Sequence, residues 1–226
     1  KARKFMKFFT TKQLLFTLVP SALALIVVIL LNQYFKISMY EIFRDPSQIA
    51  KISPFAGVMS NLGVLLWWST ASVCYFTVIF LNMFKQSEKF WFMFASALLS
   101  AYLTADDLFR IHDSVAWYLG LQEELSLMAL GVVVLAYFIK FRCDILQSNF
   151  LILLLALGFL TASVIVDHFQ DDVALSSLGE WRIFFEDGFK WLGIVFWCSY
   201  YTLTSYQILC CNFKQLYNTD KSTTRP

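Results

Sequence analysis

Six long runs of apolar residues, separated by short polar segments, constrain the fold of this chain more than any other feature. A helix needs about 20 apolar residues to cross the roughly 30 Å hydrocarbon core of a bilayer. Unbroken runs of this length do not fit the alternating strands of a membrane β-barrel. The sequence therefore predicts an all-α integral membrane protein, with one polytopic domain over residues 1–226. The six expected transmembrane helices span residues 13–31, 56–84, 90–109, 123–139, 149–167 and 183–210.

The composition agrees with this class and argues against most soluble ones. Hydrophobic residues make up 58% of the 226 residues and charged residues only 15%, whereas a soluble domain carries about 25% charged residues. The formal net charge of +2 is too small for a nucleic-acid-binding protein, which usually carries a clustered basic excess. We therefore expect contacts with membrane lipid, further association with other membrane subunits or a second copy, and no nucleic acid.

The distribution of basic residues predicts the orientation of the helices, because Lys and Arg are enriched in cytoplasmic loops. With both termini on one side of the membrane, that side carries 12 of the 18 basic and 3 of the 16 acidic residues, a net charge of +9. The opposite side then carries 6 basic and 13 acidic residues, a net charge of −7. We expect both termini to be cytoplasmic, in a plasma membrane or a bacterial inner membrane. The acidic outer face should attract cations.

The third expected helix carries a polar stripe on an otherwise apolar surface. Ionisable groups inside a membrane segment are costly, and by default they are candidates for function. Four polar side chains recur here on one helical face, and two charged side chains flank them. The stripe is formed by Ser96, Ser100, Thr104 and Asp107, and the flanking residues are Asp106 and Arg110.

The fifth expected helix ends in a group of potential metal ligands. Asp167 and Asp171 share a face at a spacing of four residues, and His168 lies between them in the sequence. Carboxylates and imidazole are good ligands for divalent cations. A solvated acidic helix end is an equally common arrangement, so the spacing alone does not decide between the two interpretations.

The sixth expected helix begins with a ladder of charges. Arg182, Glu186 and Lys190 follow one another at a spacing of four, and Asp187 can also reach Lys190. Lys190 lies about two turns inside the expected membrane boundary, so it needs a carboxylate partner. The candidate partners are Glu186 and Asp187 on the same helix and Asp107 and Asp167 on others. Gly193, on the same face as Lys190, permits close approach of a neighbouring helix.

Antiparallel alternation brings these charged segments to one leaflet. The end of the third helix, the end of the fifth and the start of the sixth all lie at the outer side, together with Ser60 and Asn61 of the second. We expect a pocket there that holds a divalent cation of open identity. Its expected metal ligands are Asp107, Asp167, His168, Asp171 and Glu186, its expected catalytic acids are Asp106 and Asp187, and its expected ion-pairing or relay residues are Lys190, Arg110 and Arg182.

Three functions are compatible with such a site. The first is a metal-dependent hydrolase or transferase that acts on a lipid or amphiphile, in which the metal activates water and a second acid moves the proton. The second is a structural or accessory subunit of a larger membrane complex, in which the ion pairs hold helices together. The third is a cation- or proton-coupled transporter, for which the cytoplasmic half offers only neutral polar groups. The sequence contains no zincin, P-loop or serine-hydrolase motif that decides between them.

Overall fold

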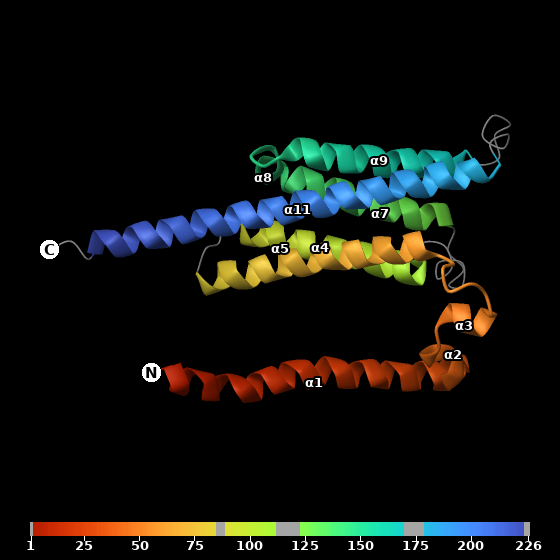
Figure 1. Ribbon diagram of the computed structural model, residues 1–226, viewed down its shortest axis with the longest axis horizontal. Coiled ribbons are helices and arrows are strands. Elements are labelled where there is room, and N and C mark those ends of the chain that lie inside the picture. Colours follow the sequence, from red (N-terminus) through yellow and green to blue (C-terminus); the bar gives the residue numbers. More distant parts are fainter. Residues whose placement is uncertain (1, 85–88, 112–122, 170–178, 224–226) are drawn as a thin grey trace. The chain divides into compact units, whose positions relative to one another are not determined.

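The computed structural model of the protein describes residues 2–84, 89–111, 123–169 and 179–223 (Figure 1). The secondary structure of these ranges is helical and includes no strand. The chain forms two compact units, Lys1–Ala56 and Gly57–Pro226. We call the first the N-terminal unit and the second the bundle.

The N-terminal unit contains one long helix followed by two short ones. The short helices begin where polar side chains satisfy free backbone N–H groups. Ser38 and Glu41 form a capping box, in which the Glu41 N–H donates to Ser38 Oγ (3.2 Å) and the Ser38 N–H donates to Glu41 Oε2 (3.0 Å). Asp45 caps the next helix by accepting from the Ser47 N–H (2.8 Å). The helices are α1 (Ala2–Phe35), α2 (Met39–Phe43) and α3 (Pro46–Ala50).

The bundle is built from long apolar helices. Helix α11 packs along both α9 and α4, and α4 packs along α5. The connection between α4 and α5 is short, so the two helices run in opposite directions and the start of α4 lies at the end of α5. The helices of the bundle are α4 (Val58–Met83), α5 (Phe90–Phe109), α7 (Glu123–Lys140), α8 (Arg142–Leu146), α9 (Phe150–His168) and α11 (Glu180–Thr223).

Each of the six expected spans contains a helix. Four of these helices agree with the expected bounds to within two residues, whereas α1 and α11 extend into the flanking polar segments at the chain termini. Among the described residues, three helices are long and apolar enough to cross a membrane: α4, α5 and α9. Two further apolar helical segments, Ser21–Phe35 of α1 and Met128–Lys140 of α7, are shorter over the residues whose side chains the structure describes. The chain is thus all-helical with three candidate spans, and six crossings stay a prediction.

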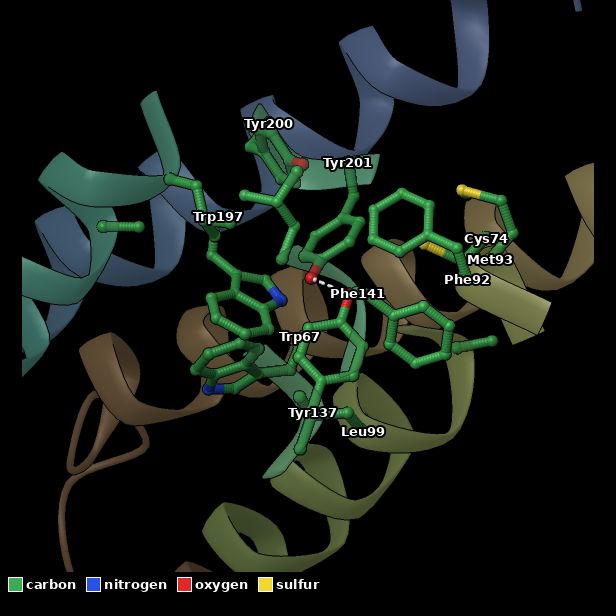
Figure 2. Packing of buried hydrophobic residues seen from close by; sticks show 14 of the residues in the cluster. Trp67, Cys74, Phe92, Met93, Leu99, Tyr137, Phe141, Trp197, Tyr200 and Tyr201 are labelled. Carbon is green, nitrogen blue, oxygen red and sulfur yellow. Dashed lines mark hydrogen bonds between the residues drawn. The ribbon is translucent and has the colours of Figure 1, made fainter. Parts of the chain in front are cut away.

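Aromatic side chains from α4, α5, α7 and α11 fill the centre of the bundle (Figure 2). The rings of Trp67 and Trp197 meet edge to face with their centroids 5.5 Å apart, and the ring centroids of Trp197 and Tyr201 are 5.2 Å apart. Phe92 of α5 contacts Phe141 beyond the end of α7 at 5.7 Å. Such aromatic pairs add directional attraction to the packing of the core.

Buried hydroxyl groups connect three of these helices through hydrogen bonds. Figure 2 shows the hydroxyls of Tyr137 and Tyr201 pointing toward one another, at 2.8 Å. The Tyr137 hydroxyl also lies 2.7 Å from Ser96 Oγ, and Trp197 Nε1 donates to Ser100 Oγ at 3.1 Å. Buried polar groups are costly unless they are paired, so these bonds restrict how α5, α7 and α11 can pack.

Helices α9 and α11 lie in close contact at Gly193. A Cβ atom at this position would lie 2.6 Å from Leu160 Cγ and 3.0 Å from the Leu160 backbone N. Gly193 therefore permits close approach of α9 and α11, as its position in the sequence predicts. The contact fixes the position of α11 along α9, and the first turns of α11 carry the charged residues.

Candidate functional site

The charged residues of α5 and α11 meet where α4 begins, α5 ends and α11 begins. We call this part of the molecule the Asp107 end of the bundle. A cavity of about 20 Å³ lies there among the three helices. Its polar lining comes from Ser60 of α4, Asp107 of α5, and Asp187 and Lys190 of α11.

Asp107 and Lys190 form an ion pair between α5 and α11, in which Lys190 Nζ donates to Asp107 Oδ1. Only 10% of the Asp107 side chain is exposed, compared with 38% for Lys190. The second carboxylate oxygen, Asp107 Oδ2, is buried and has no hydrogen-bond partner among the described residues. Because an uncompensated buried carboxylate is strongly unfavourable, Lys190 is required where it stands.

The polar stripe of α5 explains why Asp107 faces inward. Ser96, Ser100 and Thr104 are buried on the same face, so the stripe points into the bundle. The Ser96 hydroxyl donates to the Phe92 carbonyl (2.7 Å) and the Thr104 hydroxyl to the Ser100 carbonyl (2.8 Å). The hydroxyl donors of Ser96 and Thr104 are thus satisfied within α5 itself. The carboxylate at the end of the stripe needs a partner from another helix.

Gly63 of α4 creates the space beside Asp107. A Cβ atom at Gly63 would lie 3.7 Å from Asp107 Oδ2 and 3.0 Å from Ile194 Cδ1. Any larger residue would therefore intrude into the cavity that faces the free carboxylate oxygen. The absence of a side chain at Gly63 thus leaves that oxygen room for a small polar group.

A larger pocket of about 500 Å³ adjoins this cavity. Met59, Ile183, Phe184 and Gly188 provide its apolar lining, and Asp187 is its one charged lining residue. Met59 and Asp187 line both the pocket and the small cavity. We call the larger space the apolar pocket and the smaller one the Asp107 cavity.

Those of the remaining predicted residues that the structure describes lie outside these two linings. Arg182 Nη1 pairs with Glu186 Oε2 at 3.4 Å, and Glu186 lies within electrostatic range of Asp167 on α9. Of the expected pairs among Arg182, Glu186 and Lys190, the structure thus contains the first, Arg182 with Glu186. Lys190 pairs with Asp107 and not with Glu186. The physical reason is burial, because the carboxylate of Asp107 is less exposed than that of Glu186, at 10% against 26%.

Among the residues that the structure describes, the expected metal ligands do not lie around one point. Asp167 and His168 are exposed at the end of α9, and Asp171 lies outside the described residues. Over the ranges that the structure covers, no three His, Cys, Asp or Glu side chains are placed to hold a metal ion. Asp106 is buried at 6% exposure, outside both linings, and Arg110 ends α5 in a left-handed conformation.

Some features of the site have only weak signals in the sequence. Gly63 is a small residue on an apolar helix, which permits a close helix contact but does not show which group lies against it. Met59 and Phe184 look like ordinary lipid-facing residues. At the opposite end of the bundle, Lys89 Nζ pairs with Asp144 Oδ1 at 2.6 Å. This pairing joins the start of α5 to α8, which the sequence alone does not bring together.

Comparison with known proteins gives one match. A family model described as "Domain of unknown function (DUF8692)" matches residues 20–204. No curated protein matches the chain, and no solved structure matches it.

Proposed function

We propose that this chain, which belongs to the DUF8692 family, is a multi-pass membrane protein that binds an amphiphile at its outer face and acts on the head group. One observation carries the proposal: the apolar pocket and the Asp107 cavity share Met59 and Asp187. A molecule whose tail fills the pocket therefore places its head beside the charged residues. A lipid or lipid-like compound has this combination of parts.

The size and lining of the apolar pocket support the tail-binding half of the proposal. Pockets for small ligands usually measure about 300–1,000 Å³ and are mostly apolar, with a few polar groups that fix orientation. The pocket here measures about 500 Å³ and has a single carboxylate, that of Asp187. With the predicted orientation of the helices, it opens at the outer leaflet, from which an amphiphile can enter sideways.

The charged residues support the reactive half of the proposal. Asp187 is exposed, so it is accessible to exchange a proton with a bound head group as a general acid or base. Lys190, held in place by Asp107, presents a fixed positive charge that can stabilise negative charge developing on a reacting group. Hydrolysis or group transfer at the head group is the reaction class that these residues suit. In this proposal Lys190 provides the positive charge that we expected from a divalent cation on the basis of the sequence.

Photolabelling tests where the tail binds. We expect a dodecyl amphiphile with a diazirine in its chain, added to the protein in lipid nanodiscs, to label Met59, Ile183 or Phe184. Gly188→Leu should reduce that labelling by about tenfold, because one misplaced aliphatic group in a pocket typically costs this much. Mass spectrometry of the digested protein reads out the labelled residues.

The matched control is Gly158→Leu on α9, where added atoms at Cβ meet nothing within 4 Å. This variant should label as the wild type does. Labelling spread evenly over the exposed faces of α5 and α9, or unchanged by Gly188→Leu, would show that the pocket does not bind the tail.

A further inference from the structure

We infer that the amphiphile carries a primary ammonium group, and that this group enters the Asp107 cavity. The inference rests on the proposed function, since it names the chemistry of the head group that the cavity would receive. Three features of the cavity support it: its charge, its size and the number of its hydrogen-bond acceptors.

The charge of the cavity favours a cation. Asp107 and Asp187 contribute two negative charges and Lys190 one positive charge, which leaves a formal charge of −1 on the lining. Lys190 offsets the charge of Asp107, to which its Nζ donates, so the remaining negative charge is that of Asp187. Glu186 adds a further carboxylate within electrostatic range of Asp187 and Lys190. The burial of the Asp107 side chain, of which only 10% is exposed, strengthens its electrostatic interactions.

The size of the cavity selects among cations. A space of about 20 Å³ is slightly more than the roughly 10–15 Å³ that one water molecule needs. A primary ammonium group has nearly the size of water and fits this space. A trimethylammonium group carries three additional methyl groups and does not.

The acceptors of the cavity match the donors of a primary ammonium group, which has three N–H bonds and no acceptor. Three side chains with acceptor oxygens line the cavity: Ser60, Asp107 and Asp187. The side chain of Asp107 is nine-tenths buried, and its Oδ2 has no hydrogen-bond partner in the described structure. A buried acceptor without a donor is unfavourable, and an ammonium N–H directed at Oδ2 removes this defect.

Competition against the dodecyl photoprobe tests the inference on the full chain in zwitterionic nanodiscs. The competitors are dodecylamine, dodecyltrimethylammonium, dodecanol and dodecanoate, compared at equal concentration in the membrane. We expect dodecylamine to compete about tenfold better than each of the others, which corresponds to about 1.4 kcal/mol. Dodecyltrimethylammonium is the informative comparison, because it carries the same charge in a larger group.

Gly63→Ala tests whether the cavity causes the selectivity. The added methyl group points into the cavity, 3.7 Å from Asp107 Oδ2, and the 3.0 Å contact with the flexible end of Ile194 can relax. This variant should lose most of the preference for dodecylamine. Asp187→Asn should also lose the preference for dodecylamine, because it removes a negative charge from the cavity without changing its size. Gly131→Ala on α7, where a Cβ atom meets nothing within 4 Å, should keep it.

The outcomes separate the two proposals. If the photoprobe labels the pocket and all four competitors are equal, or dodecyltrimethylammonium is the strongest, the ammonium inference is wrong and the amphiphile pocket stands. The same conclusion follows if Gly63→Ala and Asp187→Asn both retain the preference, with a water molecule filling the cavity. If the photoprobe does not label the pocket at all, the proposed function itself fails.

Discussion

Replacing Lys190 with Met should destabilise the protein by about 2–3 kcal/mol at neutral pH, because it leaves a buried carboxylate without its cation. The Asp107 side chain is 10% exposed, and the buried Oδ2 already lacks a partner. We place the effect below the largest values for buried pairs, because the Lys190 side chain is 38% exposed. Thermal unfolding in detergent at neutral pH measures the loss.

The double variant Lys190→Met with Asp107→Asn supplies the control. Removing both charges leaves no isolated carboxylate, so this protein should be more stable at neutral pH than Lys190→Met alone. An equal loss for Lys190→Met and for the double variant would mean that packing of the lysine stem, and not its charge, stabilises this end of the bundle.

Replacing Gly193 with Ala should cost about 1–3 kcal/mol of stability, the usual penalty for adding atoms to a tightly packed contact. The new methyl group would lie 2.6 Å from Leu160 Cγ and 3.0 Å from the Leu160 backbone N. The side chain of Leu160 can rotate, but its backbone can move only if α9 shifts relative to α11. Thermal unfolding in detergent measures the loss.

Gly158→Ala provides the comparison, since a Cβ atom at this position on α9 meets nothing within 4 Å. This variant should keep wild-type stability or gain slightly, because Ala has the higher helix propensity. Equal stability of Gly193→Ala and Gly158→Ala would contradict a close α9–α11 contact at Gly193.

The sequence predicts the helices well because apolar run length is a local property. The bounds of α5 and α7 agree closely with expectation, and the buried face of α5 follows from the periodic placement of Ser96, Ser100 and Thr104. The extra length of α1 and α11 lies in polar segments, where helix formation does not depend on a membrane. The number of crossings is harder to predict, because α7 has only a short apolar stretch and α11 begins with several charges.

The sequence predicts which residues lie at the same end of the bundle, but not which of them form contacts. Topology alone brings Asp107, Asp187 and Lys190 to one end, and the structure places all three around one small cavity. The sequence leaves four possible partners for Lys190, because the choice depends on which helix packs against α11 and on how the two helices are shifted along their axes. Close contacts of Gly193 with Leu160 and of Gly63 with Ile194 help to set that shift. The apolar pocket also depends on this register, since it lies between α4 and α11.

Identification of molecules that remain bound after purification tests the amphiphile proposal most directly. Wild-type protein, Gly188→Leu and Gly158→Leu would be purified in the same detergent, and the bound molecules extracted and analysed by mass spectrometry. The proposal predicts one amphiphile enriched over bulk lipid in the wild type and in Gly158→Leu, and lost from Gly188→Leu. Identical lipid profiles in the three proteins, without enrichment of any species, would contradict it.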